Sequence, residues 1–387
     1  MGITMNAIYL DYNATTPLDP AVVEAMLPYL RSHYGNPSSS YVFGKTAHDA
    51  VEQARAQVAE LLGAQPDEIV FTGGGTEASN HALKGAVFAK LRGFFGRWVK
   101  GAHIITSAVE HPATLQPCAF LERLGCKVTI LPVDRFGLVD PQAVKKALDR
   151  STTIVSIMHA NNEVGTLEPI RAIADLARQQ GALMHTDAAQ SVGKLPVRVD
   201  ELDVDLLSVA GHKVYAPKGI GVLYVRRGVK LEPFIHGAGH ESGRRAGTEN
   251  VPYIVALGKA CALAGRSLPQ ATEKLRVSRD RLWERLRAGL GEAVSLNGHP
   301  ELRLPNTLNV NIAGQAGADL LEQVPQIAAS TGSACHAGQV TLSPVLEAMG
   351  VSPQVGRGAV RLSVGRFTTE EEIDQAAAAL IARAGKQ

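Results

Sequence analysis

The chain has 387 residues, 45% hydrophobic and 20% charged, which is typical of a globular protein with a large core. Its formal net charge of +2 is too small to favour nucleic acid or a membrane surface as a partner. No apolar run approaches the roughly 18 residues that cross a bilayer, and residues 1–16 show no secretory pattern. The cysteines, Cys118, Cys126, Cys261 and Cys335, lack the CxxC spacing of zinc and redox motifs, so we expect a reducing, cytoplasmic setting and no metal site.

Short β-branched runs alternate with helical stretches from about residue 50 to residue 225. The runs predicted as buried strands are Glu68–Phe71, Ile104–Thr106, Val128–Leu131, Ile154–Met158, Leu183–Thr186, Leu206–Val209 and Gly221–Val225. Helices are predicted at Glu77–Lys90, Leu115–Leu124, Pro141–Leu148 and Ile170–Gln179. This alternation predicts an α/β fold with a mostly parallel, seven-stranded sheet that is covered on both faces. The pattern leaves open the order of the last two strands and whether one is antiparallel.

The pattern changes after Pro252 to a long helical stretch, Ile254–Leu290, in which we expect a break near Pro269. Two strand signals and a closing helix follow, at Leu308–Ile312, at Val360–Val364 and from Thr368 or Thr369. These elements predict a smaller α+β C-terminal domain. We expect residues 15–258 to form the large domain and residues 1–14 and 259–387 to form the small one.

Glycine-rich or polar segments follow five of the predicted strands. They are Thr72–Glu77, Ser107–His111, His159–Glu163, Asp187–Gln190 and Ala210–Lys213. Each segment alone is most simply a structural turn or a satisfied polar residue. Ligands of open α/β sheets, however, bind outside the carboxyl ends of the strands, so the five segments together favour a common site.

The residue types in these segments suit one cofactor. Glycines before a helix let the backbone approach a phosphate, although Gly73–Gly75 alone is as readily a tight turn. A carboxylate directly after an apolar strand, such as Asp187, requires a cationic partner. A lysine in a desolvated pocket, such as Lys213, can form a Schiff base. Pyridoxal 5'-phosphate (PLP) requires all three features, with a further group over its ring.

Stretches spread over nearly the whole chain resemble the cysteine desulfurase and selenocysteine lyase family, a branch of the class V aminotransferases. They are Tyr9–Thr16, Gly35–Ser38, Asn161–Gly165, His185–Gln190, Asp205–Tyr215, Gly247–Asn250, Thr331–Cys335 and Arg361–Phe367. The resemblance implies a fold-type I PLP-dependent transferase. It also implies a homodimer with the active site at the subunit interface.

The resemblance assigns roles around the cofactor ring. Lys213 is expected to be the Schiff-base lysine, and Asp187 the partner of the pyridine nitrogen. His111 is expected to stack on the ring and assist proton transfer, while Asn162 and Gln190 contact the side of the ring that carries O3′.

The resemblance also assigns the phosphate-binding and substrate-binding residues. The phosphate is expected to be bound by Gly75, Thr76 and His212, with Thr248 contributed by the other subunit. Asn36 and Arg361 are expected to bind the substrate carboxylate, since an arginine fork suits a bidentate contact.

Two positions depart from the family pattern. Ala210 replaces a serine that usually binds the phosphate, and Ala216 replaces a common glycine after the lysine. The first change removes a hydrogen bond to a charged acceptor, worth roughly 1.5–3 kcal/mol if nothing replaces it. We therefore expect weaker retention of PLP.

Cys335 determines the expected reaction. Free cysteines are usually buried and inert, but a Gly/Ser-rich segment around Cys335 favours exposure. The resemblance implies that Cys335 attacks the substrate sulfur of L-cysteine and becomes a persulfide, leaving L-alanine, while His111 or His336 helps to form the thiolate. The sulfur would pass to an acceptor protein, for example in iron–sulfur cluster biosynthesis.

Three alternatives stay open at this point. Residues 9–17, Cys335–His336 and Ser343–Leu346 resemble selenocysteine lyase at least as closely, so selenium could be the transferred atom. An ordinary aminotransferase would not need the cysteine. A non-catalytic sulfur-transfer scaffold would not need the set of lysine, aspartate, histidine and arginine.

Overall fold

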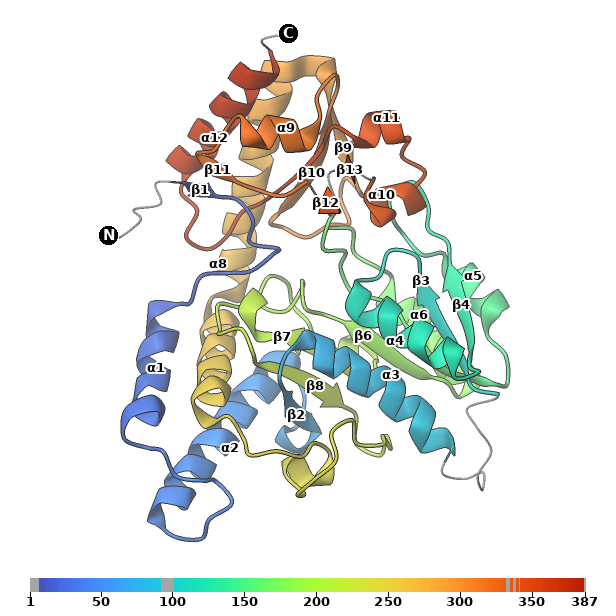
Figure 1. The fold of residues 1–387 in the computed structure, drawn as a ribbon, viewed down its shortest axis with the longest axis vertical. Helices are drawn as coiled ribbons and strands as arrows, with labels where there is room; N and C mark the ends of the chain where they lie inside the picture. Colours follow the sequence, from blue (N-terminus) through green and yellow to red (C-terminus); the bar gives the residue numbers. More distant parts are fainter. Residues whose placement is uncertain (1–6, 92–100, 332–334, 337–338, 341, 386–387) are drawn as a thin grey trace.

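The computed structural model describes residues 7–91, 101–331 and 342–385, and the backbone of residues 335–336 and 339–340 (Figure 1). A seven-stranded sheet forms the lower, larger part of the molecule in this view, and a three-stranded sheet lies in the upper part. No helix of the described chain combines the length and apolarity that a membrane span needs.

The large sheet has the strand order β2-β8-β7-β6-β5-β3-β4. Its strands are β2 (Ile69–Thr72), β3 (His103–Ser107), β4 (Lys127–Leu131), β5 (Thr152–Ser156), β6 (Leu183–Asp187), β7 (Leu206–Ala210) and β8 (Gly221–Val225). Strands β4, β3, β5, β6 and β7 are mutually parallel, and β8 is antiparallel to both β7 and β2. The predicted seven-stranded, mostly parallel sheet is therefore confirmed, and β2 ends at the same edge as the parallel strands.

The prediction that every strand is buried is wrong for β4. This strand pairs only with β3 at the edge of the sheet, and the Ile130 side chain is 56% exposed. A β-branched run can therefore form a half-exposed edge strand, which periodicity alone does not separate from a buried one.

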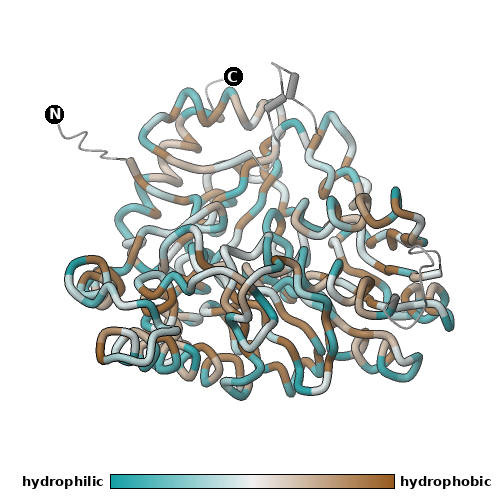
Figure 2. Tube along the Cα trace, turned by 60° about the horizontal axis from the view of Figure 1, so that its bottom comes forward, coloured by the Kyte–Doolittle hydropathy of each residue, from teal (hydrophilic) through white to brown (hydrophobic). Residues whose placement is uncertain are grey.

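The α-helices described in the large part of the molecule are α1 (Pro20–Arg31), α2 (Val42–Leu62), α3 (Gly75–Leu91), α4 (Pro112–Arg123), α5 (Pro141–Ala147), α6 (Ile170–Gln180) and α7 (Val199–Leu202). Helices α3 and α4 pack on one face of the sheet, and α2 and α6 pack on the other. Figure 2 shows hydrophobic stretches of the chain in the interior, with many hydrophilic stretches at the outside. Each face thus has its own hydrophobic core.

Helix α8 (Val251–Leu290) runs the height of the molecule and contacts both parts (Figure 1). The expected break near Pro269 is wrong, because the helix continues through this residue. Proline removes one backbone hydrogen bond and crowds the preceding turn. Helices α1 and α2 pack along α8, and so does α12 (Glu370–Ala384), and this tertiary packing overrides the local preference of proline.

The upper part contains the antiparallel sheet β14-β10-β9, formed by β9 (Val294–Asn297), β10 (Thr307–Ile312) and β14 (Ala359–Ser363). Its short elements are α9 (Gly317–Glu322), α10 (Pro344–Ala348), α11 (Pro353–Gly356), β12 (Cys335–His336) and β13 (Gln339–Val340). Thr369 caps α12, in agreement with the predicted start of the closing helix.

The N-terminal segment packs with the C-terminal core. Strand β1 (Ile8–Tyr9) pairs in parallel with β11 (Ile327–Ala328), and Leu10 is fully buried in a cluster with residues of α8, β10, β14 and α12. The exact domain boundaries stay a prediction.

Candidate active site

A cavity of about 280 Å³ lies at the carboxyl ends of the strands. Its lining residues are Ala14, Gly75, Thr76, His111, Ala113, Met158, Ala160, Asn162, Asp187, Ala189, Gln190, Ala210, His212 and Lys213. The structure thus brings together eight of the predicted site residues, from all five of the predicted strand ends.

Lys213 lies in a 3-10 turn, Gly211–Lys213, that follows β7. Its Nζ donates hydrogen bonds to the main-chain oxygens of Asn13 and Ala14, the latter at 2.8 Å. Burial and the nearby Arg361 guanidinium lower the pKa of Lys213 to about 8, although Asp187 and Asp11 act in the opposite direction. A substantial fraction of this amine is therefore neutral, and so nucleophilic, at mildly alkaline pH.

Asp187 is the last residue of β6, and its side chain is 8% exposed. One carboxylate oxygen, Oδ1, accepts the Ala189 N–H at 2.9 Å. Burial raises the pKa of Asp187, whereas that hydrogen bond and the positive charges of His111 and Lys213 lower it. A cation that bonded to Asp187 would relieve this desolvation, as the ring nitrogen of a bound pyridinium would do.

His111 is the N-cap residue of α4, and its Nδ1 accepts the Ala113 N–H at 3.1 Å. This bond leaves Nε2 as the protonated nitrogen of the neutral ring. Desolvation lowers the pKa of His111, with Asp187 opposing the shift and Lys213 reinforcing it. Near neutral pH the ring is therefore mainly uncharged, which suits contact with an aromatic cofactor.

The N-terminus of the 17-residue helix α3 forms another wall through Gly75 and Thr76. A Cβ atom on Gly75 would lie 3.1 Å from the Cβ of Ala210 on β7, so the two small residues fit closely together. His212 bonds through Nδ1 to the Thr15 hydroxyl at 3.1 Å, and burial together with the charge of Lys213 lowers its pKa to about 4. The free N–H groups of a helix N-terminus suit a phosphate at this wall.

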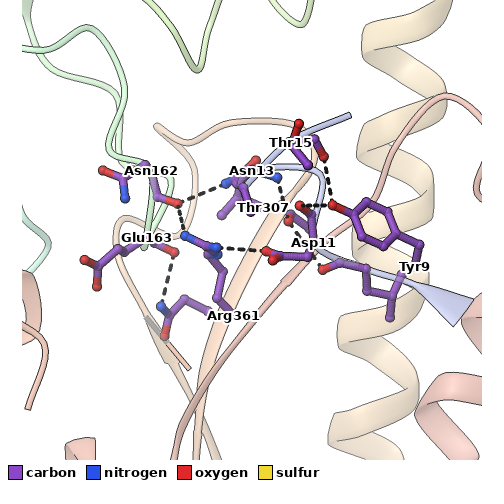
Figure 3. Close-up of polar contacts among 12 residues, drawn as sticks. Tyr9, Asp11, Asn13, Thr15, Asn162, Glu163, Thr307 and Arg361 are labelled. Carbon is purple, nitrogen blue, oxygen red and sulfur yellow. Dashed lines mark hydrogen bonds and ion pairs between the residues drawn. The ribbon is translucent and has the colours of Figure 1, made fainter. Parts of the chain in front are cut away.

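Arg361 is not among the residues that line the cavity, but its guanidinium contacts Asn162, which does line it (Figure 3). Its guanidinium donates to the main-chain oxygen of Asn162 at 3.1 Å and to Oδ1 of Asp11 at 2.8 Å. Tyr9 donates to the main-chain oxygen of Asp11 at 3.1 Å, which orders the segment that supplies this carboxylate. Asp11 therefore orients Arg361 and partly neutralises it.

Besides Arg361, three further predicted residues are not brought to this cavity in the described chain. Asn36 is exposed between α1 and α2, where its Oδ1 accepts the Ser38 N–H at 2.9 Å. Thr248, expected to act in the other subunit, is also exposed. The backbone of Cys335 pairs with that of Val340, but its side chain lies outside the described part of the structure, so its predicted role stays a prediction.

Two residues at the site were not predicted from the sequence as site residues. Asn13 bonds to Lys213, Gln190 and the Asn162 main chain, and the Asn13 side chain is buried. It lies in one of the stretches that carry the family resemblance, which was the available signal. Lys194 donates to both Asn13 and Gln190, and no pattern distinguished it from a surface lysine.

The residues present fit PLP. The amine of Lys213, the carboxylate of Asp187 and a helix N-terminus closed by Gly75 and Ala210 line one cavity. They supply an attachment point, a partner for a protonated ring nitrogen and a phosphate site. The described residues contain no group of three or more potential metal-binding side chains of His, Cys, Asp or Glu.

Comparison with known proteins gives one consistent family. The model of the class-V aminotransferases matches residues 8–376. A cysteine desulfurase IscS of Dictyoglomus turgidum is 47% identical over an alignment that covers 95% of this chain and 92% of the relative. A solved NifS-like protein is 37% identical, with a TM-score of 0.88 and coverage of 97% and 98%. A structure described as SspA in complex with cysteine is 38% identical, with a TM-score of 0.81 and coverage of 93% and 99%. The chain belongs to the cysteine desulfurase family of class-V aminotransferases.

Proposed function

We propose that this protein is a PLP-dependent cysteine desulfurase, which converts L-cysteine to L-alanine and transfers the sulfur first to Cys335. The observation that carries the proposal is the presence of Lys213 and Asp187 on one cavity, in a chain that is 47% identical to a cysteine desulfurase IscS. The solved relative SspA, 38% identical to this chain, is described as a complex with cysteine, which supports cysteine as the substrate.

The side chains around the cavity have separate roles in binding and in proton transfer. Bound PLP supplies a sink for the electrons that are released at the substrate α-carbon. Asp187 would hold the ring nitrogen in its protonated form, and His111 would contact the ring. Lys213, with a pKa of about 8, takes the α-proton on its neutral amine. Arg361 binds the substrate carboxylate, and the Asp11 contact fixes its orientation.

The transfer of the substrate sulfur to Cys335 needs no external oxidant. The Cys335 thiolate attacks the substrate sulfur, so an S–S bond forms while the substrate C–S bond breaks. The electron pair of that C–S bond stays with the carbon skeleton. Protonation of the carbon yields alanine, and Cys335 is left as a persulfide. A second thiol, on an acceptor protein, can then take the outer sulfur.

We further propose a homodimer in the reducing cytoplasm, with Thr248 completing the phosphate site of the partner subunit. Support for the reducing location comes from Cys118 and Cys261, which are buried free thiols. Thr248 is exposed, and one partner-facing hydroxyl would offset the hydrogen bond that Ala210 does not supply.

The proposed function is tested by replacing Cys335 with Ala. Cys335→Ala should lose sulfide and persulfide production from cysteine, while the visible absorbance of bound PLP persists. Cys335→Ser is the matched variant, because it keeps the size of the side chain and removes the sulfur. Sulfide release at the wild-type rate by both variants would contradict the role of Cys335.

The same assay separates sulfur from selenium as the transferred atom. Alanine production is measured with cysteine and with selenocysteine, for wild type and Cys335→Ala, with and without added PLP. A desulfurase loses turnover of cysteine in the variant. Turnover of selenocysteine alone by the wild type would instead identify a selenocysteine lyase.

A further inference from the structure

Lys194 is a buried lysine next to the cavity, in the turn that follows β6. Its side chain is 6% exposed, and its Nζ donates to Oδ1 of Asn13 at 3.1 Å and to Oε1 of Gln190 at 3.0 Å. Both partners are neutral amide oxygens, although burying a lysine normally demands a counter-charge. Lys194 has no part in the proposed chemistry, so its burial requires another explanation.

The surroundings of Lys194 disfavour its charged form. Burial lowers the pKa of Lys194 well below its ordinary value, and the cations Lys213 and Arg361 lower it further. The two amide oxygens each accept one N–H of this amine, so its donors are directed at Asn13 and Gln190.

Lys194 fixes the orientation of the Gln190 carboxamide. Gln190 lines the cavity, and its Nε2 donates to the main-chain oxygen of Asn13 at 3.0 Å. Its Oε1 faces the Lys194 amine, which is a donor at that position. Rotation of the carboxamide by a half turn would place its NH2 group against this donor. The orientation observed is the one that Lys194 permits.

Lys194 also bonds to Asn13, the residue whose main-chain oxygen contacts Lys213. Oδ1 of Asn13 accepts from Lys194 and, at 3.0 Å, from Asn306, while the main-chain oxygen of Asn13 accepts from Nζ of Lys213. One buried amine thus links Gln190 to the backbone that contacts the proposed PLP-bearing lysine.

We propose that Lys194 is a positioning residue, which holds Gln190 and Asn13 in the arrangement that binds PLP and sets the protonation of the cofactor linked to Lys213. This inference rests on the proposed function, because it concerns the same PLP site. Lys194 acts through Gln190 and Asn13 and does not touch the reacting atoms.

The test is Lys194→Met, which keeps the length of the side chain and removes the donor. Two properties are measured: the dissociation constant of PLP from the purified protein, and the midpoint of the change in its visible absorbance with pH. We expect the dissociation constant to rise about tenfold and the midpoint to move by about half a pH unit, as the loss of one hydrogen bond at the site predicts. The other charged and titratable groups that face Lys213 are unchanged in the variant; they are Asp187, Asp11, Arg361, His111 and His212.

A double-mutant cycle separates positioning from general structural damage. In a Gln190→Ala background, Lys194→Met should change PLP affinity less than it does in the wild type, because one of the two partners of Lys194 is already absent. Lys274→Met, on an exposed lysine of α8, is the control and should leave both measurements unchanged. If Lys194→Met does not fold, Lys194→Gln, which keeps an N–H donor, replaces it and should show a smaller change in the same direction.

The possible outcomes are distinct. A folded Lys194→Met protein with wild-type PLP affinity and midpoint would overturn this inference and leave the proposed function intact. Effects of Lys194→Met that are equally large without Gln190 would also overturn it. Wild-type protein that binds no PLP, and so shows no visible band, would overturn the proposed function and this inference together.

Discussion

Gly75 and Ala210 are the two small residues at the phosphate end of the cavity, and their close fit leaves the Ala210 position without a hydroxyl group. The helix N-terminus and His212 supply the other polar groups at this end. The affinity for PLP should therefore depend on whether residue 210 carries a hydroxyl oxygen.

Restoring that hydroxyl should strengthen the binding of PLP. Ala210→Ser adds one hydrogen bond to a charged acceptor, so the dissociation constant should fall about tenfold or more. Equilibrium dialysis against PLP measures it. Ala210→Cys has nearly the same shape with a weaker donor and should gain much less. Equal affinities for Ala210→Ser and wild type would show that the hydroxyl does not reach the phosphate.

The lowered pKa of Lys213 predicts how fast PLP is incorporated at different pH values. Only the neutral amine reacts with an aldehyde, so the rate should rise with pH and level off above a midpoint of about 8. Arg361→Gln removes a positive charge and should raise the midpoint, whereas Asp11→Asn removes a negative charge and should lower it. The appearance of visible absorbance after PLP is added to PLP-free protein gives the rate. Shifts of the two midpoints in the same direction would contradict this electrostatic explanation.

Among the elements, the 3-10 turn η3 (Glu241–Gly243) holds the loop that carries Thr248. Glu241 accepts from Arg55 at 2.8 and 3.1 Å and from the Phe71 N–H at 2.9 Å, and its side chain is 2% exposed. This buried ion pair ties the loop to α2 and β2.

Breaking the pair at Glu241 should destabilise the protein strongly. Glu241→Ala leaves the buried Arg55 without its buried ion-pair partner and should cost about 3–5 kcal/mol, measured as a lower midpoint of urea unfolding. Glu52 contacts the same arginine at 3.0 Å from a side chain that is 45% exposed, so Glu52→Ala should cost less than about 1 kcal/mol. Similar losses in the two variants would show that burial does not decide the strength of these ion pairs.

The sequence predicted which residues would lie together at the strand ends and most of the large sheet, but not the course of the long helix. Asp187 and Lys213 were predictable because a charged residue directly after an apolar strand has few structural uses. The continuity of α8 through Pro269 was not, since it depends on helices distant in the sequence that pack along it. Lys194 was missed because its importance comes from burial, which periodicity does not report for one lysine in a turn.

At the scale of the whole molecule, the proposed phosphate site is incomplete in a single chain, because its Thr248 would come from the other subunit of the proposed dimer. Light scattering should give twice the 41.0 kDa mass of one chain. Thr248→Val should keep this mass and raise the dissociation constant of PLP about tenfold, because it removes one hydroxyl from the partner's phosphate site. A monomer that binds PLP as tightly as the wild-type preparation would contradict the shared site.

The pairing of the N-terminal segment with the last strands determines when the site can assemble during synthesis. Asn13 donates its N–H to Ser363, and Asp11 binds Arg361, each pair 350 positions apart in the chain. Residues 8–13 leave the ribosome well before β14 does. The sheet of the large part can form in between. The segment that contacts Lys213 must therefore wait for its contacts with β14 until that strand has been synthesised, and a chain released before β14 would lack the Arg361 side of the site.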